Sequence, residues 1–95
     1  MKGTTKAEKR HMSLVASKGC CLCWRLGYRD TPAEIHHLRA GQGMGQRAGA
    51  DMVIGLCPEH HRGQTGIHGM GRRAFERHYG VTEEELLATA MAALV

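Results

Sequence analysis

Two short stretches decide the fold of this chain: Cys20-Cys21-Leu22-Cys23 and Cys57-Pro58-Glu59-His60. In each stretch two residues separate the first ligand from the last, which is the usual spacing of a zinc half-site. Tetrahedral zinc takes four thiolate or imidazole ligands, and two close pairs supply them with little loss of loop entropy. We therefore expect one structural Zn²⁺ ion. Its ligands would be Cys20, Cys23, Cys57 and His60.

Two neighbouring residues compete with these ligands. Cys21 is a surplus thiol that could replace an adjacent cysteine, but we prefer to interpret it as a small buried hydrophobic residue. His61 competes with His60 for the fourth position, and the spacing favours His60. The choice between His60 and His61 stays open at this point, and it decides which imidazole is free for another metal.

The cysteines indicate metal binding rather than disulfide formation. Residues 1–12 are polar and basic, so the sequence predicts neither a secretory signal nor a membrane span. In the expected cytoplasmic location thiols stay reduced. The 95-residue chain has one Trp, one Phe and two Tyr, so few large side chains can fill a core. A chain of this size commonly depends on a metal for stability.

The charge of the chain is unevenly distributed. Residues 1–80 contain all thirteen Lys and Arg residues against six acidic residues, a net charge of +7. A small basic body suits a polyanionic partner, most simply nucleic acid. Ordinary solubility charge explains the same count equally well, so charge alone does not identify the partner.

The hydrophobic pattern predicts an α+β fold. We expect a basic helix at about residues 5–18, followed by Gly19 at the C′ position. Residues 34–38 and 51–56 are expected to form two strands, and the glycine-rich segment 40–50 is expected to be the loop between them.

Further helices are expected after the second strand. One begins near Pro58 and another spans residues 72–79. The last spans residues 82–94, where Thr82 and Glu85 form a capping box. We interpret its apolar stripe as a core-packing face rather than a partner-binding face. The stripe comprises Leu86, Leu87, Ala90, Met91 and Leu94.

Two pairs of adjacent histidines lie within this framework, in Glu34-Ile35-His36-His37-Leu38 and in Leu56-Cys57-Pro58-Glu59-His60-His61. Together with the first cysteine pair, these segments resemble the HNH, or ββα-metal, nuclease family. The segment from His61 to Arg77 narrows the resemblance to the phage and prophage group of recombination enhancement (Ref) nucleases, which is known for RecA-dependent DNA cleavage. The resemblance covers about residues 19–80.

This resemblance implies a single ββα-metal (HNH) domain over residues 1–95 with a core at about 19–80. The domain would contain a zinc knuckle and be flanked by the helices at 5–18 and 82–94. The implied activity is that of a metal-dependent DNA endonuclease that hydrolyses phosphodiester bonds, encoded by a phage or prophage. The implied partners are DNA and a RecA-type recombinase filament.

The family pattern also implies roles for single residues. His36, His61 and His68 match ligands of the catalytic metal, and His37 matches the general base. The middle residue of the pattern is often Asn, but this chain contains none. Asp51 lies nearest to that position and is expected to orient His37. The catalytic ion is expected to be Mg²⁺ or Mn²⁺, with Zn²⁺ as a further candidate.

The proposed chemistry agrees with the residue types. A neutral imidazole can take a proton from water, and a divalent ion can stabilise the phosphoryl oxygens and the leaving oxygen. Nearby arginines would contact phosphates, although a solvated helix face explains any one of them equally well. These arginines are Arg62, Arg72, Arg73 and Arg77.

One physical objection concerns His36 and His37. Neighbouring residues of a regular strand point to opposite faces, so both can serve one reaction only if the substrate reaches both faces or the strand is irregular. Two other functions stay open. One is a non-catalytic zinc-binding DNA module on the same scaffold, and the other is an adaptor that uses the stripe at 86–94 as its contact face.

Overall fold

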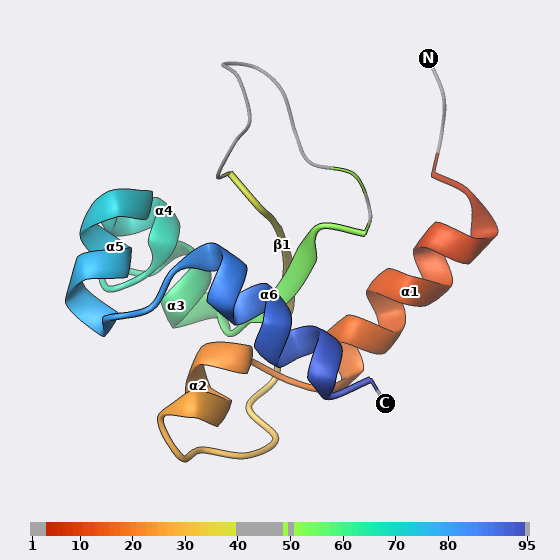
Figure 1. Ribbon diagram of the computed structural model, residues 1–95, viewed down its shortest axis with the longest axis horizontal. Coiled ribbons are helices and arrows are strands. Elements are labelled where there is room, and N and C mark those ends of the chain that lie inside the picture. Colours follow the sequence, from red (N-terminus) through yellow and green to blue (C-terminus); the bar gives the residue numbers. More distant parts are fainter. Residues whose placement is uncertain (1–3, 40–48, 50, 95) are drawn as a thin grey trace.

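A short antiparallel pair of strands lies at the centre of the fold (Figure 1). The computed structural model describes residues 4–39, 49 and 51–94. Strand β1 is Glu34–His37 and strand β2 is Val53–Leu56. The pairing is continuous from Glu34 opposite Leu56 to His37 opposite Val53. All four residues of β2 are buried, so this strand is the centre of the core.

Helices surround the strands on several sides. Figure 1 shows α1 on one side of the strands, α3, α4 and α5 on the other, and α6 crossing in front. Helices α1, α2 and α6 all contact β2. None of the described helices is long and apolar enough to cross a membrane. The helices are α1 Lys6–Ser17, α2 Cys21–Arg25, α3 Pro58–Arg62, α4 Ile67–Met70, α5 Arg72–Tyr79 and α6 Glu83–Ala92.

Buried apolar side chains from α2, β2, α4, α5 and α6 form one cluster, which also contains Leu38, the residue after β1. Leu38, Leu56, Phe75 and Leu86 are fully buried within it. The same cluster contains the three cysteines expected to bind zinc, so the core and the zinc ligands are continuous. A metal bound there would therefore stabilise the packing of the whole core.

The apolar stripe of α6 faces this core. Leu86 and Ala90 are buried, and Leu87 and Met91 are partly buried against the cluster. This agrees with the core-packing interpretation of the stripe. It removes the main support for an adaptor that would use this face to contact a partner.

Local signals define most helix ends. The expected capping box at the start of α6 is present, since Thr82 Oγ1 accepts from the Glu85 N–H at 3.1 Å and Glu85 accepts from the Thr82 N–H at 2.8 Å. Thr5 and Glu8 form the same arrangement at the start of α1. Gly19 follows α1 with a φ of +83°, a conformation that an L side chain rarely adopts. The terminal helices are thus shorter than the expected 5–18 and 82–94, because Thr5 and Thr82 are caps.

The region of the first cysteine pair forms a short helix. Cys20 Sγ accepts the Cys23 N–H and caps this helix, α2. Trp24 follows Cys23, is about half exposed, and has the Arg29 guanidinium 3.4 Å from its ring centroid. The strands are also shorter than the expected 34–38 and 51–56. The predicted loop at 40–50 lies outside the described residues except for Gly49.

Candidate metal centres

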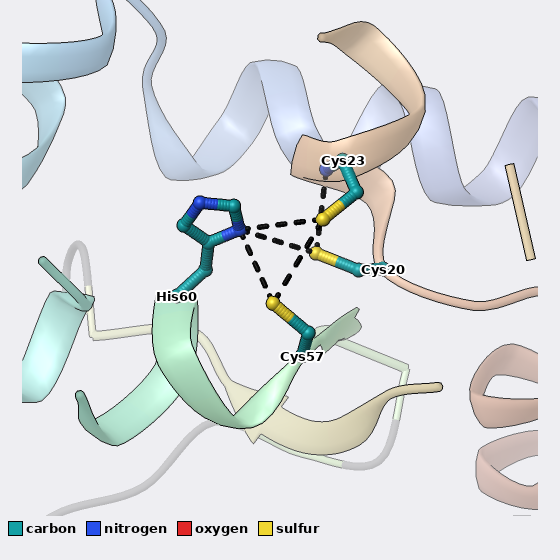
Figure 2. A group of neighbouring side chains, drawn as sticks. All are labelled: Cys20, Cys23, Cys57 and His60. Atoms are coloured by element: carbon teal, nitrogen blue, oxygen red, sulfur yellow. Dashed lines mark hydrogen bonds between the residues drawn. The ribbon is translucent and has the colours of Figure 1, made fainter. Parts of the chain in front are cut away.

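The four residues expected to bind zinc lie together in space. Figure 2 shows two of them at the start of α2 and two at the start of α3. Their ligand atoms all lie within 4.8 Å of one another. We call this group the Cys3His cluster. It comprises Cys20, Cys23, Cys57 and His60.

The distances within the Cys3His cluster fit a tetrahedral ion. With zinc–sulfur bonds of about 2.3 Å and a zinc–nitrogen bond of about 2.0 Å, two sulfurs lie about 3.8 Å apart and sulfur and nitrogen about 3.5 Å apart. The Sγ atoms of Cys23 and Cys57 are 3.8 Å apart. The Nδ1 atom of His60 lies 3.7, 3.5 and 3.3 Å from the Sγ atoms of Cys20, Cys23 and Cys57. The residues present therefore fit a zinc ion.

Burial affects all the cysteines of the first pair region in the same direction, but Cys21 lies outside the Cys3His cluster. Burial raises the pKa of Cys20 and Cys23, so these thiols would ionise only with a cation beside them. Burial also raises the pKa of Cys21 to about 12, and this thiol lies outside the Cys3His cluster. Its surroundings match a small buried hydrophobic residue. Burial lowers the pKa of His60, which favours the neutral imidazole that a metal requires.

A second group of possible ligands consists of three histidines from three elements. His36 comes from β1, His61 from α3 and His68 from α4, and their ligand atoms lie within 4.8 Å of one another. We call this group the histidine cluster. The Nε2 atoms of His61 and His68 are 3.2 Å apart. Two imidazoles on one tetrahedral ion would place these nitrogens about 3.3 Å apart, so the spacing fits a shared metal.

The approach of His68 depends on a tight turn between α3 and α4. A Cβ atom on Gly66 would overlap the carbonyl oxygen of Glu59, and one on Gly69 would overlap that of Gly63. Only glycine lets the two short helices pack this closely. The Glu59 carboxylate closes the turn by accepting from the backbone N–H of Thr65 at 3.0 Å and from its hydroxyl at 2.6 Å. The glycines therefore bring His68 beside His61.

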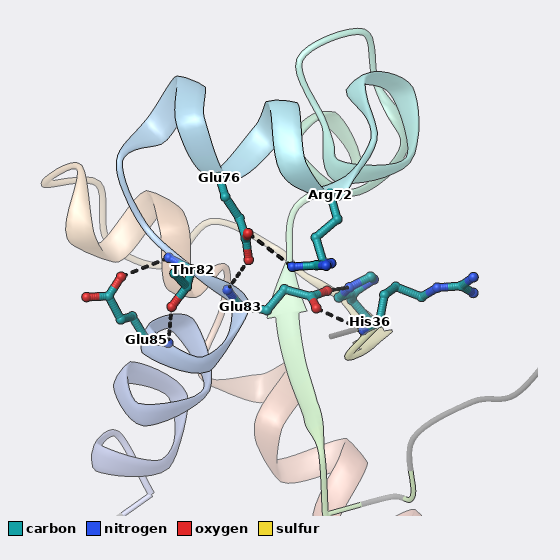
Figure 3. Close-up of polar contacts among 7 residues, drawn as sticks. His36, Arg72, Glu76, Thr82, Glu83 and Glu85 are labelled. Atoms are coloured by element: carbon teal, nitrogen blue, oxygen red, sulfur yellow. Dashed lines mark hydrogen bonds and ion pairs between the residues drawn. The ribbon is translucent and has the colours of Figure 1, made fainter. Parts of the chain in front are cut away.

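Two carboxylates support the histidine cluster from outside. Glu34 accepts from His61 Nδ1 at 2.8 Å, and Glu83 accepts from His36 Nε2 at 2.7 Å. Glu83 is fully buried and also accepts the backbone N–H of Arg39 at 2.9 Å. Figure 3 shows Glu83 reaching His36, while the Glu83 N–H donates to Glu76 at 2.9 Å. Metal-binding histidines commonly donate their second N–H to such a carboxylate.

Sequence reasoning did not identify these carboxylates as site residues. Glu34 lies two residues before His36, so strand alternation places both on one face and could have indicated it. Glu83 lies 47 residues after His36 and reaches it only through the packing of α6. In the sequence, a glutamate in the first turn of α6 is already explained by its favourable interaction with the helix dipole.

The structure does not bring the other expected catalytic residues into the histidine cluster. His37 is partly exposed and is the last residue of β1. Because the strand pairing is continuous, its side chain leaves the strand on the face opposite His36. Asp51 is exposed and lines a shallow hollow with Ala7, Glu8 and His11 of α1. Asp51 is thus not a member of the histidine cluster, and it shares this hollow with α1.

The predicted DNA-binding arginines have different surroundings. Arg62 donates two side-chain hydrogen bonds to Glu34 Oε2, at 3.0 and 2.8 Å, and with His61 it lowers the pKa of Glu34 to about 2. Arg72 pairs with Glu76 at 3.2 Å. Arg73 and Arg77 form no ion pair within the described part of the chain. The latter two are therefore freer to contact a substrate.

The fold and the two clusters together define a small α+β protein with two candidate metal centres. The family model described as recombination enhancement, RecA-dependent nuclease matches residues 4–95. The chain belongs to this family, whose name indicates a nuclease that acts in recombination. No curated protein matches the chain.

Proposed function

We propose that this chain is a metal-dependent DNA endonuclease of the HNH type, folded as one domain. The Cys3His cluster would hold a structural zinc, and the histidine cluster would hold the catalytic ion. One observation carries the proposal: His60 and His61 are neighbours on α3 but belong to different clusters. Consecutive helix residues differ in direction by about 100°, so one short helix can serve both centres.

The donor atoms indicate which ions suit the histidine cluster. Imidazole nitrogen suits Zn²⁺ and other transition metals, whereas Mg²⁺ prefers oxygen ligands and retains several waters. Three imidazoles therefore favour Zn²⁺ over Mg²⁺ as the catalytic ion, and Mn²⁺ is retained as a transition metal that accepts imidazole less readily than Zn²⁺ does. When bound, such an ion supplies positive charge that stabilises the phosphoryl and leaving oxygens.

The residues around the histidine cluster would orient its imidazoles. Glu34 fixes the Nδ1–H tautomer of His61, which leaves Nε2 free to bind a metal. Glu83 accepts from Nε2 of His36, which leaves Nδ1 of that ring as the metal-binding atom. His68 is largely exposed, so the cluster is open to solvent and substrate on its side.

His37 is our proposed general base. It is partly exposed at the end of β1, from which the chain continues through Leu38 to Arg39. Because His36 and His37 leave the strand on opposite faces, His37 would take its proton from a water reached around the end of the strand. This geometry makes His37 the first role to test by mutation. Asp51, which is exposed and lines a hollow with residues of α1, is our proposed orienting residue for His37.

DNA is the proposed substrate, and a RecA-type recombinase filament is the proposed partner. The family name and the excess of basic residues over residues 1–80 support both. The experiment is a cleavage assay on single-stranded, duplex and displacement-loop DNA, with and without a recombinase filament, in Mn²⁺, Zn²⁺ or Mg²⁺. We expect cleavage that requires added metal and is greater with Mn²⁺ or Zn²⁺ than with Mg²⁺.

A matched pair of histidine variants tests the assignment of the site. His68→Ala should abolish cleavage while the protein keeps its fold and the zinc of the Cys3His cluster. His78→Ala, which removes another exposed histidine, should cleave like the unchanged protein. Undiminished cleavage by His68→Ala would contradict the assignment, and DNA binding without cleavage in any metal would indicate a non-catalytic DNA module.

A further inference from the structure

A hollow of about 490 Å³ lies directly beside the open side of the histidine cluster. His68 belongs both to the cluster and to the wall of this hollow. A substrate held at the histidine cluster would therefore extend into it. The lining residues are Arg39, Ile67, His68, Gly71, Arg72 and Arg73.

Three of the six lining residues are arginines, and their charge is largely uncompensated. Arg72 pairs with Glu76 at 3.2 Å, whereas Arg39 and Arg73 form no ion pair within the described residues. The buried carboxylate of Glu83 lies close by, but it accepts from His36 and from the backbone of Arg39. The hollow therefore carries net positive charge and suits an anion.

The backbone adds to this preference. Helix α5 begins at Arg72, and no side chain caps its first N–H groups. These groups and the helix dipole favour negative charge at the helix start. Guanidinium groups are well suited to bind phosphate oxygens with two hydrogen bonds. Side-chain charge, shape and backbone thus all favour a phosphate group.

We propose that this hollow is a subsite for a second phosphate of the cleaved strand, adjacent to the phosphate that is hydrolysed. Arg39 and Arg73 bind that phosphate, and Arg72 completes the wall of the subsite. This inference rests on the proposed nuclease function, and it adds that the substrate must continue beyond the scissile bond. A single phosphodiester without a neighbouring phosphate leaves the subsite empty.

The test uses oligonucleotides in which one phosphate next to the cleavage site is replaced by an uncharged methylphosphonate. For the unchanged protein, we expect this replacement to lower kcat/KM about tenfold, the scale of a hydrogen bond to a charged group. Arg73→Ala should lower kcat/KM on the unmodified oligonucleotide by a similar factor. The methylphosphonate replacement should then lower the kcat/KM of this variant little further. Arg39→Ala should behave in the same way, because its backbone N–H remains to bind Glu83.

Two controls separate this subsite from general effects. Arg77 lies one turn further along α5 and outside the hollow, so Arg77→Ala should retain the full methylphosphonate effect. Bis(p-nitrophenyl) phosphate has only one phosphate, so Arg73→Ala should hydrolyse it as fast as the unchanged protein does. Equal methylphosphonate effects in Arg73→Ala and the unchanged protein would overturn the subsite.

The proposal can also be judged if no cleavage is found. DNA binding is then measured as a function of salt. The slope of log K against log salt is negative, and each lost phosphate contact reduces its magnitude by about 0.7 to 0.9. Arg73→Ala should reduce the magnitude of this slope even in a protein that does not cleave. An unchanged slope would overturn the subsite, whereas a shallower slope without cleavage would contradict only the nuclease function.

Discussion

The two clusters of possible metal ligands share helix α3 but differ in burial, in ligand type and in their openness to solvent. In the Cys3His cluster three thiols are each at most 6% exposed, and all four ligands needed for a closed zinc site are present. The histidine cluster has three imidazoles, an exposed member in His68, and carboxylates behind two of its rings. A closed site of four ligands suits a structural role, and a three-ligand site with an open side suits substrate binding.

This difference also indicates how the two clusters depend on each other. Helix α3 has only five residues, which is too short to be stable by itself. A metal ion bound by the Cys3His cluster would fix this helix through Cys57 and His60. It would thereby position His61 against β1 and α4. On our proposal, loss of the first site therefore destroys the second, whereas loss of the second leaves the first intact.

The largest expected effect comes from breaking the Cys3His cluster. A structural zinc contributes about 10–16 kcal/mol in zinc-finger peptides, which is similar to or larger than the roughly 5–15 kcal/mol stability of a whole domain. Cys57→Ser should therefore abolish cooperative thermal unfolding and remove both metals, as measured by circular dichroism and elemental analysis. Cys21→Ala is the matched control and should keep its metal content. A folded, zinc-free Cys57→Ser protein would contradict the structural role.

The next largest effect concerns His37, the proposed base, which lies on the strand face opposite His36. His37→Ala should lower kcat by a factor of about 10² to 10⁴, the usual contribution of general base catalysis. The fold and the content of both metals should not change, because His37 lies outside both clusters. Cleavage at the normal rate would show that another group activates the water.

A smaller effect is expected from the buried carboxylate behind His36. Glu83→Gln keeps the shape of the side chain but removes its charge, and changes of this kind typically cost about 10- to 100-fold in metal affinity. The measurement is titration of the histidine cluster with Mn²⁺ while the zinc of the Cys3His cluster is retained. Glu84→Gln is the control, because Glu84 is exposed on the same turn. Equal Mn²⁺ affinity in both variants would mean that Glu83 does not position His36.

The smallest effect is expected for Arg62, which sequence reasoning grouped with the DNA-binding arginines. Its guanidinium is largely exposed and is already engaged by Glu34. Exposed ion pairs contribute little to stability, so Arg62→Ala should leave the melting temperature almost unchanged. Its effect on DNA affinity should be smaller than that of Arg73→Ala in the same binding assay. A larger effect would place Arg62 in direct contact with DNA.

Much of the fold could be predicted from local sequence signals. The paired spacings indicated the members of the Cys3His cluster, and Thr82 with Glu85 indicated the start of α6, because both depend on residues close in sequence. The capping box at Thr5 and Glu8 was equally readable but was not identified. Helix ends and ligand spacings are local properties, so sequence contains them directly.

The surroundings of the histidine cluster could not be predicted in the same way. The contact between His36 and Glu83 depends on how α6 packs across β2. The position of His68 depends on two glycines that allow close backbone contact, which a pattern of glycines alone does not reveal. Asp51 was chosen for its nearness in sequence, and the hollow that it shares with α1 depends on how α1 packs beside the turn before β2. These features follow from tertiary packing.

Trp24 lies next to the Cys3His cluster in the sequence, so its fluorescence can report on that site. It is the one tryptophan of the sequence, it follows the ligand Cys23 directly, and its ring lies against the guanidinium of Arg29. The intrinsic fluorescence of this protein therefore arises almost entirely beside the Cys3His cluster. Release of zinc would free α2 and change the environment of this ring. Tryptophan emission would thus report the occupancy of one of the two candidate metal centres, without any attached label.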